Sequence, residues 1–95
     1  MKNAVVMGLG ASGQGALALL GKQGFRCIGV DLRTGLDPIP GVELQLGPHR
    51  RQTFLDADLI VVSPGIPLTA PDLVAAREAG VEILGEMGRR FRLER

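Results

Sequence analysis

The sequence predicts an α/β fold of three layers, in which helices cover both faces of a mostly parallel sheet of about five strands. Short apolar runs alternate with Ala- and Leu-rich or charged segments along all 95 residues, which is the pattern of strands alternating with helices. Two of the runs, residues 4–7 and 59–62, are apolar without a break, as in parallel strands buried on both faces. A chain of 10.0 kDa has room for one core, so we expect residues 1–95 to form a single domain.

The first half of the chain is expected to begin with a strand at residues 4–7. The Ala- and Leu-rich stretch 12–22 then predicts a helix that closes at the glycines Gly21 and Gly24, because glycine readily adopts the left-handed conformation that ends helices. The other elements expected in this half are a strand at 26–30, a Pro- and Gly-rich connection at 34–41, a short strand at 43–46 and a brief helix at 50–57.

The second half contains the most clearly marked helix start. Residues 69–72 read Thr-Ala-Pro-Asp, which predicts Thr69 as the N-cap, a proline in the first turn and an acid near the helix N-terminus. The helix is expected to cover residues 73–79 and to stop at Gly80. We expect a last strand at 81–84 and a charged helical stretch from Glu86 onward, interrupted by Gly88.

Charge and composition exclude several classes of function. The net charge is +1, and three phenylalanines are the only aromatic residues. The chain therefore lacks both a basic field and a stacking platform for nucleic acid, and we expect no such partner. No signal peptide is recognisable and no apolar run approaches the ~18 residues of a membrane span, so we expect a cytoplasmic protein without membrane contact. The single cysteine suits a reducing compartment, and we expect a monomer.

A glycine-rich loop follows the first expected strand. Residues 8–13 read Gly-Leu-Gly-Ala-Ser-Gly and fit the G-x-G-x-x-G pattern between a strand and a helix. In that context the first glycine permits a tight turn, the second lets a ligand approach the backbone, and the third lets the helix pack on the strand. The amides at the helix N-terminus suit a diphosphate. A purely structural turn between strand and helix is the alternative.

Two further segments are expected at the same edge of the sheet. Asp31 ends the second strand, roughly 20 residues after the loop, where an acid typically accepts bonds from ribose hydroxyls. Arg33 follows it and could recognise a 2′-phosphate or stack on a base. A rigid Ser-Pro-Gly-Ile-Pro segment at residues 63–67 comes directly after the strand at 59–62, so Ser63 is expected to face a polar ligand or to lie in a plain turn.

No residue pattern predicts bond chemistry. His49, the only histidine, lies in a Pro-His-Arg-Arg segment that we expect to be a surface turn. Cys27 is expected to face the core as a small apolar residue. Neither belongs to a nucleophile–base pair or to a set with metal-ligand spacing. We therefore expect neither a catalytic residue nor a metal site in this chain.

Four segments together resemble a known family, the N-terminal domain of the Mur ligases. These are Val-Val-Met-Gly-Leu-Gly-Ala-Ser-Gly at residues 5–13, Asp-Leu-Arg at 31–33, Ala-Asp-Leu-Ile-Val-Val-Ser-Pro-Gly-Ile-Pro at 57–67, and Gly-Glu-Met at 85–87. The resemblance covers essentially the whole chain and is closest to the members that add D-glutamate. It departs from the family at residues 88–90, Gly-Arg-Arg, where an acid and apolar residues are usual, and at Leu32, which is often small and polar.

The resemblance implies a three-domain cytoplasmic ligase of peptidoglycan synthesis, of which this chain is the Rossmann-like, UDP-binding first domain. Its substrates would be UDP-N-acetylmuramoyl-L-alanine and D-glutamate, and the absent domains would bind ATP and Mg²⁺. The chain alone would hold no cofactor and would be inactive. Ala11 and Ser12 would contact the diphosphate, residues 31–33 would surround the uracil, and residues 63–65 would lie near the phosphates and the sugar. The candidate UDP-binding residues are Gly10, Ala11, Ser12, Gly13, Asp31, Leu32, Arg33, Ser63, Pro64 and Gly65.

Two other functions share part of this pattern. The NAD(P)-binding domain of a dehydrogenase would have the glycine loop and Asp31, but it would not explain the Ser-Pro-Gly-Ile-Pro segment. A non-enzymatic nucleotide-sensing module would also have the loop and the acid, and such modules commonly dimerise.

Overall fold

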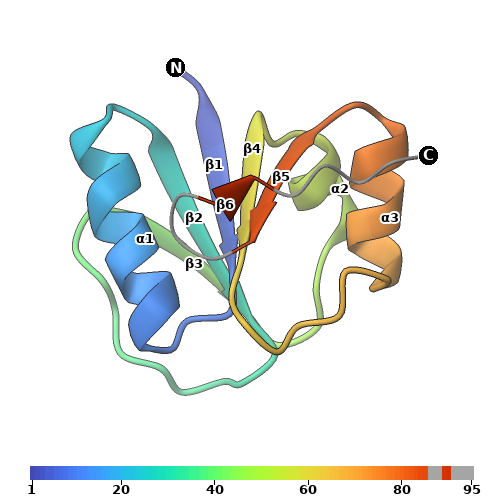
Figure 1. The fold of residues 1–95 in the computed structure, drawn as a ribbon. Helices are drawn as coiled ribbons and strands as arrows, with labels where there is room; N and C mark the ends of the chain where they lie inside the picture. The colour runs from blue at the N-terminus through green and yellow to red at the C-terminus, as the bar shows by residue number, and fades with distance from the viewer. Residues whose placement is uncertain (86–88, 91–95) are drawn as a thin grey trace.

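The computed structural model describes residues 1–85 and 89–90. Within these residues the chain forms a six-stranded sheet and three helices (Figure 1). The strands are β1 (Asn3–Met7), β2 (Arg26–Asp31), β3 (Val42–Leu46), β4 (Leu59–Val62), β5 (Glu82–Gly85) and β6 (Arg89–Arg90). The helices are α1 (Ala11–Lys22), α2 (Arg51–Leu55) and α3 (Pro71–Glu78).

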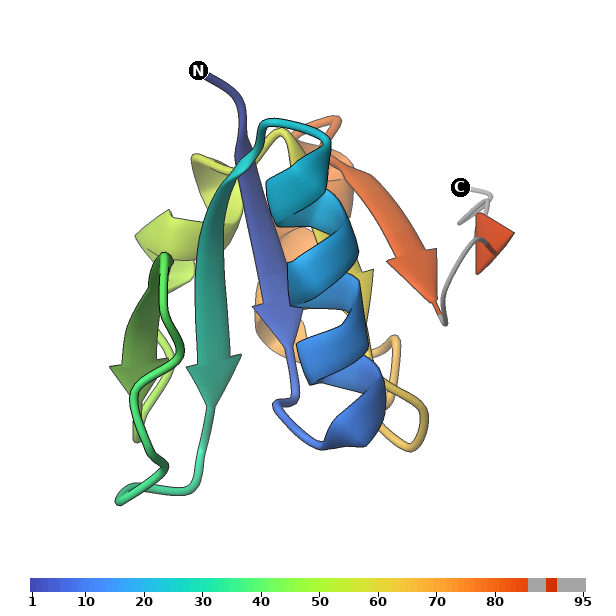
Figure 2. The same ribbon diagram turned by 90° about the vertical axis from the view of Figure 1, so that its left-hand side faces the viewer.

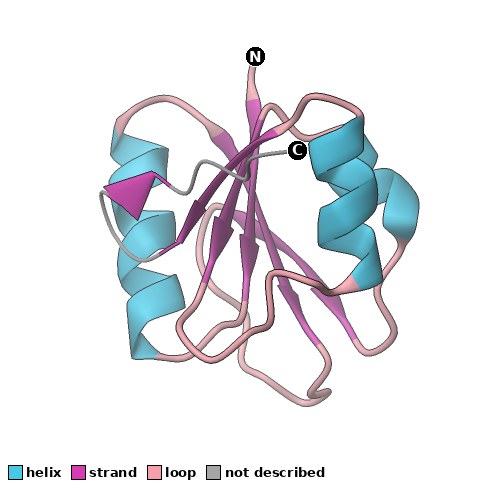
Figure 3. Ribbon diagram, turned by 45° about the vertical axis from the view of Figure 1, so that its right-hand side comes forward, coloured by secondary structure: helices cyan, strands magenta, loops and turns pink. Residues whose placement is uncertain are grey.

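The sheet has the strand order β3-β2-β1-β4-β5-β6. Strands β1 to β5 are parallel to their neighbours, and β6 is antiparallel to β5. Helix α1 covers one face of the sheet, and α2 and α3 cover the other (Figures 1 and 3). Figure 2 looks onto the α1 face, where the helix runs antiparallel to the strands. The predicted three-layer α/β fold is therefore confirmed.

Two apolar clusters form the core, one on each face of the sheet. Val5 of β1 packs in the cluster that includes Phe54 of α2 and Leu73 of α3. Its neighbours Ala4 and Val6 pack in the cluster beneath α1. Successive side chains of a strand point to opposite faces, so a central strand covered on both faces must be apolar at every position. This is the reason for the unbroken apolar runs of β1 and β4.

The N-cap of helix α3 lies one residue later than the sequence predicts. Ala70, not Thr69, is the N-cap, and no side chain caps the helix. Pro71 explains the shift, because a proline disfavours helical backbone in the residue before it, and Ala70 accordingly has φ −54° and ψ +134°. The predicted stop is confirmed, since Gly80 follows the helix with φ +90°.

The segment after β5 differs from its prediction. Residues 89–90 form the short strand β6, so the helical prediction is wrong at these two positions. The rest of that predicted helix, residues 86–88 and 91–95, lies outside the described residues. Over the described ranges, no helix is long and apolar enough to span a bilayer.

Candidate functional site

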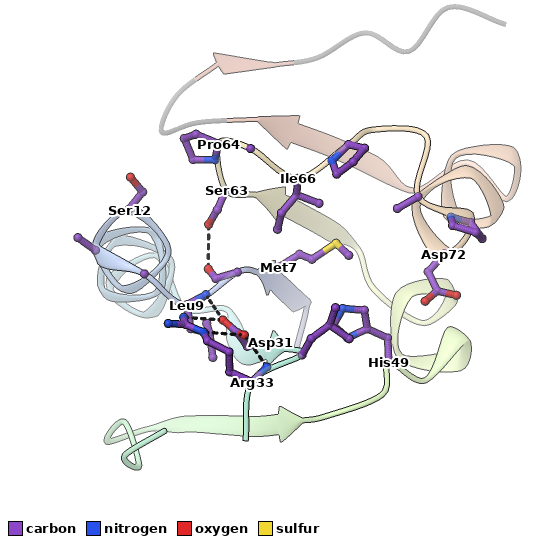
Figure 4. Close-up of a pocket in the computed structure, with 18 residues that line it drawn as sticks. Met7, Leu9, Ser12, Asp31, Arg33, His49, Ser63, Pro64, Ile66 and Asp72 are labelled. Atoms are coloured by element: carbon purple, nitrogen blue, oxygen red, sulfur yellow. Dashed lines mark hydrogen bonds and ion pairs between the residues drawn. The ribbon is translucent and has the colours of Figure 1, made fainter. Parts of the chain in front are cut away.

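A pocket of about 690 Å³ opens at the edge of the sheet where β1, β2, β3 and β4 end (Figure 4). Its size lies within the range of ~300–1,000 Å³ that is usual for small-molecule sites. From β1 the chain continues to β2 on one side and later to β4 on the other, and parallel sheets bind ligands at such a reversal of strand order. The lining residues are Met7, Gly8, Leu9, Gly10, Ala11, Ser12, Asp31, Leu32, Arg33, His49, Ser63, Pro64, Gly65, Ile66, Pro67, Ala70, Pro71 and Asp72.

The three glycines of the loop have different roles. Gly8 has φ +95°, a conformation that glycine adopts without steric cost. A Cβ on Gly13 would overlap the carbonyl oxygen of Gly8, so the missing side chain allows α1 to pack against the end of β1. Gly10 lines the pocket, and a Cβ there would meet no atom within 4 Å. The absence of a side chain at Gly10 therefore leaves the start of α1 accessible to a ligand in the pocket.

The first turn of α1 is available to an anion. Gly10 is its N-cap, no side chain caps the helix, and the first turn contains no acidic residue. Ala11 and Ser12 are exposed and line the pocket. Free amides and the positive end of a helix dipole together attract phosphate and carboxylate groups.

Asp31 connects the glycine loop to the end of β2. Its Oδ2 accepts a hydrogen bond from the Leu9 amide at 2.9 Å and one from Arg33 Nη2 at 2.9 Å. Its Oδ1 accepts bonds from the Arg33 amide at 2.9 Å and from Arg33 Nε at 3.1 Å. The Arg33 guanidinium, aided by the Arg33 and Leu9 amides, holds the pKa of this carboxyl well below its ordinary range, although burial opposes the shift.

These four bonds fill the acceptor sites of the Asp31 carboxylate, which has about four lone-pair sites. The residue is only 8% exposed, whereas the side chain of Arg33 is 60% exposed. A ligand hydroxyl can therefore bond to Asp31 only by sharing an oxygen with Arg33 or by displacing it. In this structure Asp31 positions the loop, and Arg33 presents the outer surface of the pair.

Ser63 connects the loop after β4 to the glycine loop. Its hydroxyl donates to the Gly8 carbonyl at 2.8 Å, and its amide donates to the Met7 carbonyl at 3.0 Å. The hydroxyl proton is thus engaged within the chain, and the oxygen lone pairs remain. Pro64 and Gly65 are exposed beyond it, and Gly65 has φ +91°.

The fold places the residues expected from the sequence in one site. Nine of the ten candidates line the pocket, and Gly13 is the exception. Gly13 is buried behind the loop, where its role is packing. The expected assembly of the ends of β1, β2 and β4 around one cavity is confirmed, while contact with a ligand remains a prediction.

A family model described as "Mur ligase MurD-like, N-terminal domain" matches residues 2–85. The chain belongs to this family. Three curated relatives are each named UDP-N-acetylmuramoylalanine–D-glutamate ligase. The protein of Methylobacillus flagellatus is 41% identical over 93 residues, that of Yersinia pestis 42% over 90, and that of Acidobacterium capsulatum 39% over 94. Each match covers 90% of this chain and 20% of the relative, so the chain spans about a fifth of their length.

Solved structures show how widely this fold occurs. D-2-hydroxyisocaproate dehydrogenase matches with a TM-score of 0.69 and 23% identity over 90% of this chain and 26% of the other. The NADPH-dependent glyoxylate/hydroxypyruvate reductase of Sinorhizobium meliloti matches with a TM-score of 0.64 and 24% identity, over 88% of this chain and 29% of that one. Identities this low establish the fold alone, so they do not make the Mur ligase domain a dehydrogenase.

His49 is one of the site residues of this Mur ligase domain that the sequence did not indicate. The segment does lie at the surface, since Pro48 and Arg50 are exposed, but His49 itself is half-buried and lines the pocket. The ring packs edge-on against Phe54, with centroids 5.7 Å apart and an interplanar angle of 70°. The position of His49 just after β3 was a usable signal, since parallel strands end at one edge of a sheet.

Asp72 is a second lining residue that was assigned only to the helix start. Its Oδ1 accepts a hydrogen bond from Arg51 Nε at 3.0 Å, so the ion pair joins the beginnings of α2 and α3. Figure 4 shows Asp72 on the opposite side of the pocket from Ser12. An anion at the start of α1 is thus kept apart from the carboxylate at the start of α3.

Proposed function

We propose that this chain binds the UDP group of UDP-N-acetylmuramoyl-L-alanine, as the N-terminal part of a ligase that joins D-glutamate to this substrate. The observation that carries the proposal is the unobstructed first turn of α1, which opens into the pocket beside Gly10. Such a site accepts a diphosphate without any cationic side chain. The family match and the names of the relatives support the choice of substrate.

In this proposal the diphosphate lies against the amides of Ala11 and Ser12. The uracil lies toward the segment 31–33 after β2, where the exposed side chain of Leu32 adds apolar surface. The N-acetylmuramoyl sugar of the substrate lies toward the loop after β4, near Pro64 and Gly65.

The remainder of the reaction belongs to parts of the ligase outside these 95 residues. We propose that ATP, Mg²⁺ and D-glutamate bind there, and that the chain alone is an inactive monomer. In the full-length ligase it would serve peptidoglycan synthesis in the cytoplasm. Because the isolated chain supplies only part of the substrate's contacts, it should bind UDP weakly.

Titration calorimetry of the chain with UDP, UMP and NAD tests the proposal. We expect binding of UDP, weaker binding of UMP because one phosphate is lost, and no binding of NAD. Binding of NAD without binding of any uridine nucleotide would contradict the proposal and would favour a dehydrogenase domain. Light scattering of the same sample should give a monomer, whereas a stable dimer that prefers adenine nucleotides would favour a sensing module.

A matched pair of variants localises the diphosphate. Gly10→Ala and Gly15→Ala each add one methyl group where a Cβ meets no atom within 4 Å, but only Gly10 lines the pocket. We expect Gly10→Ala to weaken UDP binding about tenfold, which corresponds to about 1.4 kcal/mol, and Gly15→Ala to leave it unchanged. Equal affinity of the two variants would place the diphosphate elsewhere.

A further inference from the structure

The pocket continues past Asp31 toward the end of β3, where His49 lies. The strands β1, β2 and β3 are neighbours in the sheet, and their carboxyl ends carry, in that order, the glycine loop, Asp31 and the segment with His49. A nucleotide anchored by its phosphates at α1, with its base beside residues 31–33 as proposed above, would therefore turn one edge of that base toward the end of β3. This inference rests on the proposed function and adds to it the residue that recognises the base.

The imidazole of His49 has a fixed orientation. Phe54 has no exposed surface and holds the ring in an edge-on contact with centroids 5.7 Å apart. In Figure 4 the ring projects from the connection between β3 and α2 into the pocket. A side chain that is already oriented loses little conformational entropy when it binds a ligand.

The two ring nitrogens of His49 differ in their surroundings. Nδ1 is buried and has no hydrogen-bond partner within the described part of the chain. Nε2 is not among the buried unpartnered atoms and forms no hydrogen bond with a described residue, so it is accessible. In neutral imidazole one nitrogen carries the proton and the other accepts. A proton on Nδ1 would leave a buried N–H without an acceptor, which is costly; the tautomer with the proton on Nε2 avoids this cost and makes Nε2 a hydrogen-bond donor at the pocket.

We propose that His49 is a specificity-determining residue, whose Nε2–H donates a hydrogen bond to the O4 carbonyl oxygen of the uracil base. Uracil and cytosine share the carbonyl oxygen O2 and differ at position 4. Cytosine has an amino group in place of O4, which would oppose Nε2–H donor to donor. A site that is built around one donor rejects the analogue that cannot accept, because polar groups are then left unpaired. His49 thus favours UDP over CDP.

Calorimetry with UDP and CDP on the 95-residue chain tests this assignment. We expect the wild-type chain to bind UDP about fivefold or more tightly than CDP. His49→Phe keeps an aromatic ring against Phe54 but has no donor, so UDP affinity should fall about two- to tenfold and the preference should disappear. His49→Gln carries an amide that can rotate to donate or accept, and it should bind both nucleotides with similar affinity.

A control in the same segment is Arg50→Gln, because Arg50 is exposed and does not line the pocket. The loss of its charge would affect both diphosphates equally, so the UDP to CDP ratio should stay at the wild-type value. A wild-type ratio that His49→Phe and His49→Gln leave intact, with UDP still bound, overturns the role of His49 and leaves the proposed function standing. Absence of uridine nucleotide binding by the wild-type chain overturns the proposed function itself.

Discussion

At the scale of single residues, the carboxylate of Asp31 is the group on which the site geometry depends most. It holds the Leu9 amide and the Arg33 guanidinium at once. Its folded-state pKa is lowered, so its ionised form stabilises the fold at neutral pH. That contribution is complete above the unfolded pKa of about 3.9 and disappears as the pH falls through the lower folded-state pKa.

Asp31→Asn removes this charge while it keeps the shape of the side chain. We expect the variant to lower the free energy of unfolding by about 1–2 kcal/mol at pH 7, because charge-assisted bonds are replaced by weaker ones. The difference from wild type should shrink steadily below about pH 4. Urea denaturation at pH 7, 5 and 3 measures it, with the exposed Asp37→Asn as the control. A difference that is independent of pH would show that the charge of Asp31 does not stabilise the fold.

At the scale of elements, helix α1 contains two glycines with opposite steric surroundings. A Cβ at Gly13 would overlap the Gly8 carbonyl, whereas a Cβ at Gly15 would meet no atom within 4 Å. Neither position has the positive φ that an alanine would strain. The same substitution therefore acts at one position through packing and at the other through helix propensity.

We expect Gly13→Ala to destabilise the chain by about 2 kcal/mol or more, since the start of α1 must move away from the end of β1. Gly15→Ala should stabilise it by roughly 0.5–1 kcal/mol, because alanine is the better helix former. Thermal unfolding of the two variants and of the wild type measures both changes in stability, with the midpoint temperature falling for Gly13→Ala and rising for Gly15→Ala. Stabilisation by both substitutions would mean that α1 and β1 are packed less closely than the structure places them.

The sequence predictions are correct where a few adjacent residues determine the structure, and wrong where a neighbouring proline or a distant strand determines it. Buried strands were predictable because residues 4–7 and 59–62 are apolar at every position, and helix stops because Gly24 and Gly80 require positive φ. The N-cap of α3 was misplaced because the restriction that Pro71 puts on Ala70 outweighs the capping preference of Thr69. The helical prediction is wrong at residues 89–90 because their strand depends on pairing with the edge of β5, which no local pattern contains.

The same reasoning separates the predictable part of the site from the rest. Asp31 and Ser63 were found because each ends a clearly apolar strand, and the ends of parallel strands meet at one edge. His49 was missed because β3 is only partly buried and its pattern is weak. The bonds from Leu9 and Arg33 to Asp31 were also not predictable, since they depend on the distance between two loops in the folded chain.

At the scale of the whole molecule, the reactivity of the Cys27 thiol can show whether the chain unfolds as one cooperative unit. Cys27 is 4% exposed and lies among the residues that α1 covers. Its sulfur is 3.8 Å from the Leu17 carbonyl oxygen, and burial raises the pKa of the thiol. It lies near the start of β2, whereas Asp31 at the pocket is the last residue of that strand. A ligand in the pocket therefore cannot shield the sulfur directly.

We expect a thiol reagent to modify Cys27 at a rate set by unfolding of the chain, about a thousandfold or more below the rate of an exposed thiol if the fold is stable by about 5 kcal/mol. UDP at ten times its Kd should slow the reaction about elevenfold, because a ligand that binds only the folded state stabilises it by mass action. The release of a coloured thiolate measures both rates, and NAD at the same concentration is the control. A rate that bound UDP leaves unchanged would show that β2 and α1 open locally while the pocket stays formed, so that the domain does not unfold as one unit.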